Sequence, residues 1–193
     1  MLNAALESWD PVSVLIDTER LRLRRFQPAD IPAFAAYRSD PDVARYQEWD
    51  FPLSLESAGR LVRRYARSDP ARPGWFQYAV ELKADECLLG DVAVNRQAGG
   101  EEAEVGFSLA RDRQGQGYAT EAVRGVLDDL FGGGLRTASA ECDVRNERSE
   151  RLLERLGFEF VSQRTVYVPG KREWTDLRMF SLPAEKWDGP GGG

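Results

Sequence analysis

The sequence contains no histidine among its 193 residues. This absence excludes Ser-His-Asp and Cys-His nucleophilic catalysis, and it excludes metal sites that depend on imidazole ligands. A catalytic base must therefore be Asp, Glu, Tyr, Lys, Cys or a water held by one of them. Only two cysteines are present, Cys87 and Cys142, and they are far apart in the chain. They are predicted to be separate buried thiols rather than a metal-binding or redox pair.

Long apolar runs are also missing. No stretch approaches the ~20 apolar residues of a membrane helix, and Met1–Trp9 lacks the basic and then apolar profile of a signal peptide. The formal net charge of −6 argues against broad nucleic-acid binding, because such binding depends on neutralising phosphates. We predict a cytoplasmic protein without a membrane or nucleic-acid partner, whose acidic charge favours a cationic substrate.

The periodicity of apolar residues predicts one mixed α/β domain. Its predicted bounds are 1–188, with an N-terminal extension over 1–13 and a disordered tail over 189–193. Strands are predicted at Arg20–Phe26, Phe76–Leu82, Leu88–Arg96, Ala103–Leu109, Thr137–Val144, Glu159–Val168 and Trp174–Leu182. Helices are predicted at Asp30–Tyr37, Leu55–Arg67, Ala119–Leu130 and Glu147–Leu156.

The segment Arg111–Thr120 (RDRQGQGYAT) connects a predicted strand to a strongly periodic helix. A helix start presents backbone N–H groups without intrahelical partners together with the positive end of the helix dipole, and this combination binds anions. Gly115 and Gly117 allow the backbone to approach a phosphate closely. Arg111 and Arg113 add positive charge at the rim. The segment is therefore a candidate phosphate-binding turn.

Two other kinds of phosphate-binding glycine turn differ from this segment. A P-loop needs Lys-Ser or Lys-Thr after its last glycine, whereas Tyr118 and Ala119 follow Gly117. A dinucleotide-binding turn needs a third glycine where Thr120 stands, and it normally follows the first strand of its unit. A plain strand-to-helix loop remains an alternative, because short glycine motifs often match by chance.

The residues Gln114–Ala119 (QGQGYA) resemble the Gln-x-x-Gly-x-Ala signature of the GNAT acetyltransferase superfamily. Further segments resemble its ribosomal-protein N-terminal acetyltransferase branch and occur in family order: Thr18–Phe26 (TERLRLRRF), Asp30, Glu104–Leu109, Asn146, Ser149 and Leu156–Phe158. The resemblance runs from Thr18 to Leu182. It implies an α/β (α+β) fold, in which one GNAT-like domain has a mixed, mostly antiparallel sheet flanked by helices and splayed at the fourth strand, Ala103–Leu109.

The resemblance also implies acetyl-CoA as the cosubstrate, without a metal. In the family, the strand before the turn splays from its neighbour at a bulge, and the pantetheine arm pairs with its exposed backbone, here at Phe107, Ser108 and Leu109. The pyrophosphate is expected on the turn formed by Gln114, Gly115, Gln116, Gly117, Tyr118, Ala119 and Thr120. Asn146 aligns with an asparagine that contacts the coenzyme arm, although its place before a helix also predicts an N-cap.

Glu104 stands where many members of the superfamily carry a general-base glutamate. A carboxylate with a raised pKa, or a water relayed by it, can take the proton that the amine must lose before it attacks. Alternatively, Glu104 and the nearby Glu101 and Glu102 are solvated charges beside a turn. The branch also uses a glutamate just after the Gly-Phe pair, but the expected offset falls on Val161, whereas Glu159 directly follows Phe158.

Ser149 matches the serine of the branch that hydrogen-bonds the departing coenzyme sulfur. Many superfamily members use a tyrosine four residues before the Gly-Phe pair, but here that position is Leu153, which has no proton to donate. Ser149, or a water that it orients, is therefore the candidate acid. The alternative is a serine at a helix start that bonds only to nearby backbone.

The resemblance implies direct acetyl transfer to a primary amine in a ternary complex, with the carbonyl oxygen stabilised by a backbone N–H of the splayed strand. The acceptor is left open between a protein N-terminus and a small molecule such as an aminoglycoside, and a non-catalytic acetyl-CoA-binding or regulatory module is the further alternative. A substrate groove is predicted from Tyr46, Glu48, Trp49, Asp50 and Asp176, although ordinary packing equally fits the aromatic residues. Similar proteins are frequently dimers, so the resemblance also allows a homodimer.

Overall fold

Eight strands form one sheet in the order β1-β2-β3-β4-β5-β6-β8-β7. The structure is a computed structural model that describes residues 14–49 and 51–189. The strands are β1 Val14–Asp17, β2 Leu21–Arg24, β3 Gly74–Leu82, β4 Cys87–Arg96, β5 Glu102–Leu109, β6 Thr137–Asp143, β7 Glu159–Val168 and β8 Glu173–Pro183. Neighbouring strands are antiparallel except β5 and β6, which are parallel. The prediction of a mixed, mostly antiparallel sheet is confirmed.

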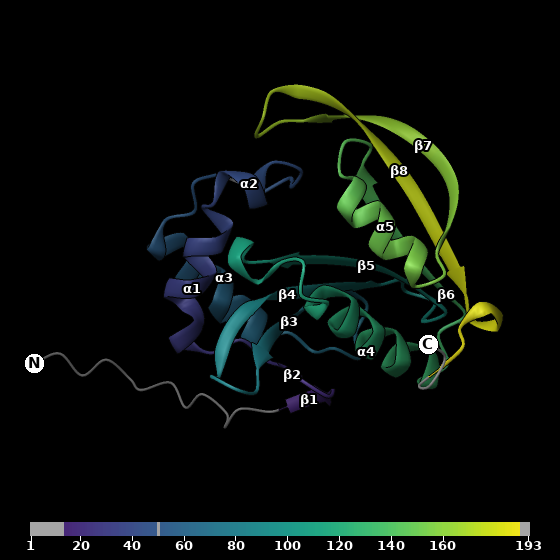
Figure 1. Cartoon of the computed structure of the whole chain (residues 1–193), viewed down its shortest axis with the longest axis horizontal. Coiled ribbons are helices and arrows are strands. Elements are labelled where there is room, and N and C mark those ends of the chain that lie inside the picture. The colour runs from purple at the N-terminus through teal and green to yellow at the C-terminus, as the bar shows by residue number, and fades with distance from the viewer. Residues whose placement is uncertain (1–13, 50, 190–193) are drawn as a thin grey trace, which may run out of the picture.

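Helices cover both faces of this sheet (Figure 1). The α-helices are α1 Ile31–Arg38, α2 Pro41–Ala44, α3 Leu55–Arg67, α4 Tyr118–Gly132 and α5 Glu147–Arg155. Three short 3-10 helices are η1 Pro28–Asp30, η2 Arg111–Arg113 and η3 Ala184–Lys186. The four predicted helices are confirmed, and their bounds differ by at most two residues.

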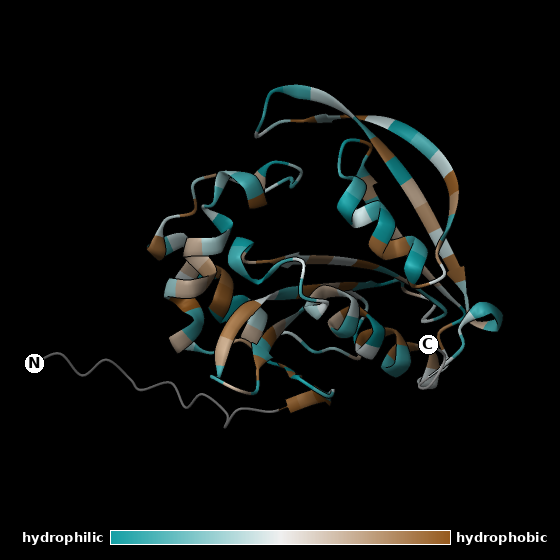
Figure 2. Ribbon diagram, viewed as in Figure 1, coloured by the Kyte–Doolittle hydropathy of each residue, from teal (hydrophilic) through white to brown (hydrophobic). Residues whose placement is uncertain are grey.

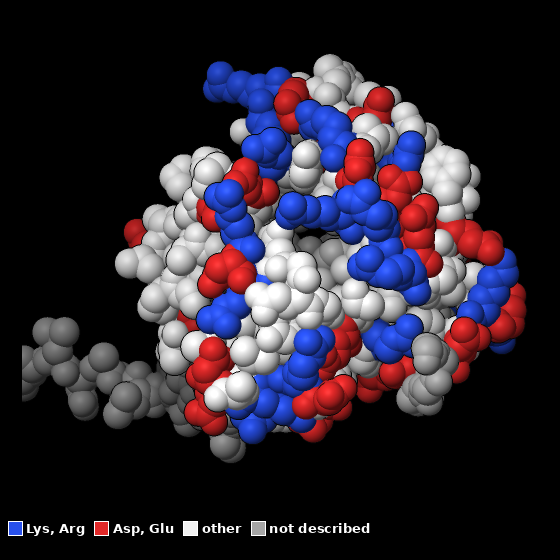
Figure 3. All heavy atoms as spheres, in the orientation of Figure 1, with Lys and Arg blue, Asp and Glu red and all other residues white. Residues whose placement is uncertain are grey.

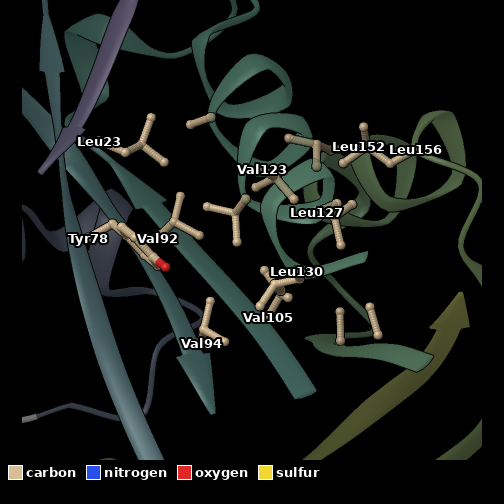
Figure 4. Close-up of a cluster of buried hydrophobic side chains, with 14 of the residues drawn as sticks. Leu23, Tyr78, Val92, Val94, Val105, Val123, Leu127, Leu130, Leu152 and Leu156 are labelled. Carbon is tan, nitrogen blue, oxygen red and sulfur yellow. The ribbon is translucent and has the colours of Figure 1, made fainter. Parts of the chain in front are cut away.

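The main core lies between the sheet and the pair α4 and α5. Buried Val92 and Val105 on the strands face Val123 and Leu127 of α4, and Leu152 of α5 completes the layer (Figure 4). This packing explains why α4 forms where it does, because its apolar residues recur at helical spacing and bury one continuous stripe. The first turn of α4 is thereby held at the end of β5.

A second cluster packs α1 and α3 on the opposite face of the sheet. Phe26 and Phe34 meet edge-on with their ring centroids 5.2 Å apart. At the end of α1, Tyr37 donates a 2.5 Å hydrogen bond to the buried Asp91 of β4, and Arg38 forms a 3.0 Å ion pair with the same carboxylate. These bonds hold the end of α1 against β4, and α2 begins three residues later.

The strands β5 and β6 separate after a short parallel contact. Their pairing ends at Glu104 opposite Ser139, whereas β4 stays paired with β5 from Ala103 to Leu109. The predicted splay at this strand is therefore confirmed. The bulge expected there is not present in the β4–β5 ladder, whose register runs without a shift over the described residues. Divergence from β6 alone opens the gap.

The hairpin of β7 and β8 bends away from the rest of the sheet and arches toward α2 (Figure 1). Near its tip, Lys171 Nζ lies 2.5 Å from the backbone oxygen of Arg45, which follows α2. The hairpin therefore closes one side of the opening that the splay creates.

The strand β1 was not predicted. It pairs with β2 and is coloured brown, as a hydrophobic ribbon, in Figure 2. This strand and the turn after it approach α4 at Gly125, where an added Cβ would lie 2.9 Å from Thr18 Cγ2. Only a residue without a side chain permits this approach. With four residues and no polar alternation, β1 lacks the pattern that identifies a strand.

Two further predictions concern the cysteines and the ends of the chain. Both cysteines are free, and Cys142 is buried as predicted, but Cys87 is exposed and the prediction for it was wrong. It opens β4 directly after a turn, so its side chain stays in solvent. The predicted extension over 1–13, and all of the predicted tail except Gly189, lie outside the described residues. The domain bounds 1–188 stay a prediction.

Candidate functional site

A cleft of about 1430 Å³ opens where β5 ends and α4 begins. Its walls come from α2 and the residues after it, the end of β5, the β5–α4 turn, the first turn of α4, and α5. The predicted residues that line it are Tyr46, Phe107, Ser108, Leu109, Gln114, Gly115, Gly117, Ala119, Thr120, Asn146 and Ser149. The fold thus gathers at one opening most of the residues that were predicted from separate parts of the sequence.

The backbone of the β5–α4 turn has the conformation that its glycines predicted. Gly115 and Gly117 have φ values of +76° and +84°, which lie in the left-handed region that favours glycine. Gly117 is the N-cap of the fifteen-residue helix α4, and no side chain caps this helix start. The first N–H groups of α4 therefore remain available as donors for an anion.

Gln114 anchors the turn on both sides. Its Nε2 donates a 3.0 Å hydrogen bond to the carbonyl oxygen of Leu109, and its Oε1 accepts a 3.3 Å hydrogen bond from Arg148 of α5. Two turn residues point elsewhere. Gln116 bonds the carbonyl of Asp112, and Tyr118 lies beneath Arg20, so neither side chain belongs to the cleft wall.

Asn146 and Ser149 meet at the start of α5. Asn146 is the N-cap, and its Oδ1 accepts a 3.3 Å hydrogen bond from the backbone N–H of Ser149. The predicted cap is confirmed. A contact with a coenzyme carbonyl would use Nδ2 of Asn146, so the cap and the predicted contact are compatible. The side chain of Ser149 is half-buried in the cleft wall.

The cleft is bordered by arginines, of which the sequence had indicated only Arg111. Figure 3 shows Lys and Arg side chains gathered around a central hollow. The arginines that line the cleft are Arg45, Arg111, Arg124, Arg145, Arg148, Arg151 and Arg155. Three of them recur on α5 at spacings of three and four residues, a pattern that places them on one helix face. This spacing was the signal available in the sequence. The local positive charge suits a ligand with several phosphates, despite the net negative charge of the chain.

Glu104 lies outside the cleft lining, in a polar group under the β7–β8 hairpin. It is half-buried, and Asn95 of β4, which is its direct partner in the ladder, hydrogen-bonds its side chain. On β6, Glu141 forms bonds of 2.8 and 2.6 Å with Arg164. Burial raises the pKa of Glu104, and the Glu141 carboxylate raises it further, whereas the Asn95 bond and Arg164 act in the opposite direction. The result is a pKa above the ordinary value of a glutamate, as a proton acceptor near neutral pH needs.

The residues predicted for the substrate groove do not all lie together. Glu48 is exposed, and its charge contributes to the raised pKa of Glu104. Trp49 instead packs over Arg38, with 4.1 Å from the guanidinium carbon to the ring centroid. Asp176 accepts a 2.6 Å hydrogen bond from Thr165 on the β7–β8 hairpin. Asp50 lies outside the described residues.

No helix within residues 14–49 and 51–189 combines the length and apolar character that crossing a bilayer requires. In the same part of the chain, no three Cys, Asp or Glu side chains gather as metal ligands. A metal-free site stays a prediction.

Comparison with known proteins identifies relatives over nearly the whole chain. The model of the acetyltransferase (GNAT) domain family matches residues 20–159. YnaD of Bacillus subtilis, named as an uncharacterized N-acetyltransferase, is 27% identical over 174 residues, which are 90% of this chain and 99% of YnaD. The crystal structure of a GNAT-family acetyltransferase from Bacillus anthracis has a TM-score of 0.79 at 25% identity, covering 88% of this chain and 98% of that one. RimL, a ribosomal alpha-N-protein acetyltransferase, has a TM-score of 0.72 at 18% identity, with coverage of 89% and 94%.

Proposed function

The chain belongs to the acetyltransferase (GNAT) family, and from this premise we propose that it transfers the acetyl group of acetyl-CoA to a primary amine. The resemblance noted in the turn and its flanking segments is thus confirmed at the level of the family. The observation that carries the proposal is the arginine-bordered cleft at the splay of β5 from β6, with an uncapped helix start at its wall.

The residues of the cleft fit acetyl-CoA. The turn at Gly115–Thr120 offers backbone donors for the pyrophosphate. The space beside Gly115 is open, because an added Cβ there would meet no protein atom within 4 Å. The end of β5 beyond Glu104 has no β6 partner within the described ladder, so its backbone can pair with the amide groups of the pantetheine arm. When bound, the coenzyme supplies an activated acetyl group as a thioester.

In the proposed mechanism, Glu104 accepts the proton of the acceptor amine, directly or through a water. Glu104 lies three residues before Phe107, where β5 reaches the cleft, so the proposed base and the proposed acetyl donor site lie on the same strand. Ser149 donates a hydrogen bond to the sulfur of the departing thiolate. A backbone N–H of β5 stabilises negative charge on the carbonyl oxygen. Holding both substrates in one geometry accounts for much of the rate.

The acceptor is proposed to be a cationic amine, either a protein N-terminus or a small molecule. Glu48, Glu104 and Glu141 supply negative charge beneath the hairpin, and opposite charges favour such a ligand. A cytoplasmic location, a homodimer and the absence of a nucleic-acid partner stay predictions.

The proposal is tested by incubating the protein with acetyl-CoA and a panel of amines that includes peptide N-termini, polyamines and aminoglycosides. We expect release of coenzyme A thiol that depends on one class of amine, corrected for the exposed thiol of Cys87. Mass spectrometry of the amine should show the acetyl group. Tight binding of acetyl-CoA without turnover of any amine would instead favour the non-catalytic, regulatory alternative.

Ser149→Ala should lower kcat about tenfold, as expected when one hydrogen bond of about 1.5 kcal/mol to the departing thiolate is lost, and leave KM for acetyl-CoA unchanged. The cap at the start of α5 uses the backbone N–H of Ser149, which alanine keeps, so α5 should be undisturbed. Steady-state kinetics at saturating amine measure the effect, and the thermal midpoint serves as the control. An unchanged kcat would remove Ser149 from the mechanism.

A further inference from the structure

Arg20, which stands just before β2, contacts the β5–α4 turn without itself lining the cleft. Its Nη1 donates a 3.0 Å hydrogen bond to the carbonyl oxygen of Gln116, and its Nε donates a 2.6 Å bond to Glu121. The guanidinium carbon lies 4.6 Å from the ring centroid of Tyr118. The Arg20 side chain thus contacts Gln116 in the β5–α4 turn, and Tyr118 and Glu121 in the first turn of α4.

The bond to Gln116 orients the peptide unit that follows it. In a trans peptide the C=O and N–H groups point in opposite directions. Because Arg20 holds the Gln116 carbonyl on its own side, the N–H of Gly117 is directed away from Arg20. Gly117 lines the cleft, whereas Arg20 and Gln116 do not. The N–H of Gly117 is therefore presented to the cleft.

The second contact of Arg20 is with the negative charge of Glu121 in the cleft wall. Glu121 lies in the first turn of α4 and lines the cleft, next to the turn proposed to bind the diphosphate. Burial acts to raise the pKa of Glu121, but hydrogen bonds from Thr18 and Arg20 outweigh it, so the pKa lies below the ordinary value. Its carboxylate is ionised at neutral pH and, without a counter-charge, would repel an anion.

We propose that Arg20 is a positioning residue for recognition of the coenzyme diphosphate. It directs the N–H of Gly117 into the cleft and neutralises Glu121, and it does both without touching the ligand. Thr18 assists by donating a 2.6 Å hydrogen bond to Glu121. The inference rests on the proposed use of acetyl-CoA, and it assigns a role to Thr18 and Arg20, two residues that do not themselves line the cleft.

The test compares two acetyl donors. Acetyl-CoA carries the diphosphate, whereas acetyl-pantetheine has the same thioester and arm without it. In Arg20→Ala we expect kcat/KM for acetyl-CoA to fall about tenfold, through KM, as expected for a lost bond to a charged group. We expect kcat to stay within about twofold and kcat/KM for acetyl-pantetheine to be unchanged. A merely structural role would weaken both donors alike, so equal losses, or no loss for either, would overturn the proposal.

Three further variants complete the test. Arg22→Ala is the matched control, since Arg22 lies on the same segment but pairs with Glu81 and Glu86; it should leave the ratio between the two donors unchanged. Adding Glu121→Gln to Arg20→Ala removes the uncompensated carboxylate and should restore about threefold of the lost affinity for acetyl-CoA. If Arg20→Ala does not fold, Arg20→Lys keeps the charge but loses the fork of donors, and a selective loss of about threefold is expected.

The experiment distinguishes a wrong role for Arg20 from a wrong proposal of acetyl transfer. If the wild-type protein uses neither acetyl donor, the proposed acetyl transfer is wrong. If the wild type prefers acetyl-CoA and Arg20→Ala keeps that preference, the transfer stands and only the role of Arg20 is wrong.

Discussion

Glu104→Gln should lower kcat about 10²–10³-fold, the range expected when a general base is lost. Glutamine keeps the size of the side chain and its hydrogen bond with Asn95, but it accepts no proton at neutral pH. Because the substitution also removes a half-buried negative charge beside Glu141, the folded protein should not be destabilised. The measurement is kcat with a good acceptor amine at saturating acetyl-CoA.

The pH profile provides the control for this variant. Glu104 acts only when it is deprotonated, and its pKa lies above the ordinary value because burial and Glu141 disfavour its charge. In the wild type, kcat/KM should therefore decline as the pH falls through this raised pKa. The Glu104→Gln variant should lose this decline in kcat/KM. It should keep the separate pH dependence that comes from protonation of the acceptor amine. Full activity in Glu104→Gln, with the same acidic limb, would assign the base to another group.

Gly115→Ala should weaken acetyl-CoA binding by about 100-fold, or ~3 kcal/mol. Gly115 has a φ of +76°, and an alanine there either carries a strain of about 1–2 kcal/mol or shifts the backbone to a negative φ. The shift would turn the amides of the turn away from the diphosphate. Each charge-assisted hydrogen bond contributes about 1.5–3 kcal/mol, so loss of one or two accounts for the effect. Calorimetric titration with acetyl-CoA measures it.

Gly100→Ala is the matched control for this prediction. Gly100 lies in the turn between β4 and β5, has a φ of +74°, and like Gly115 has no neighbouring atom within 4 Å of an added Cβ. Both alanines carry the same backbone cost and should lower the thermal midpoint equally. Only Gly115→Ala should weaken binding of acetyl-CoA. Equal affinities in the two variants would place the diphosphate away from the β5–α4 turn.

Much of the fold could be predicted because its elements carry strong local patterns. The bounds of α3, Leu55–Arg67, and of β7, Glu159–Val168, are those predicted from periodicity and turn residues. The strand β1 was missed because its four residues have no alternating pattern, and contacts with distant segments stabilise it there: pairing with β2, the approach to Gly125 and the ion pair of Asp17 with Lys83. Such long-range contacts leave little trace in a short segment.

The candidate site was predictable where a local motif dictates the backbone. The turn at Gly115 and Gly117 and the cap at Asn146 are of this kind. The direction of the Trp49 side chain could not be predicted in this way. Its indole packs over Arg38 at the end of α1, and this contact depends on tertiary structure. The role proposed for Arg20 likewise depends on a contact with Gln116, which is 96 residues away in sequence.

A crystal structure with coenzyme A bound would examine the central claim at the level of atoms. The account places diphosphate oxygens within about 3 Å of the backbone nitrogens of the turn at Gly115–Thr120, with the pantetheine arm along β5 between Phe107 and Leu109. A diphosphate bound at any other surface, or an arm that avoids the gap between β5 and β6, would contradict it.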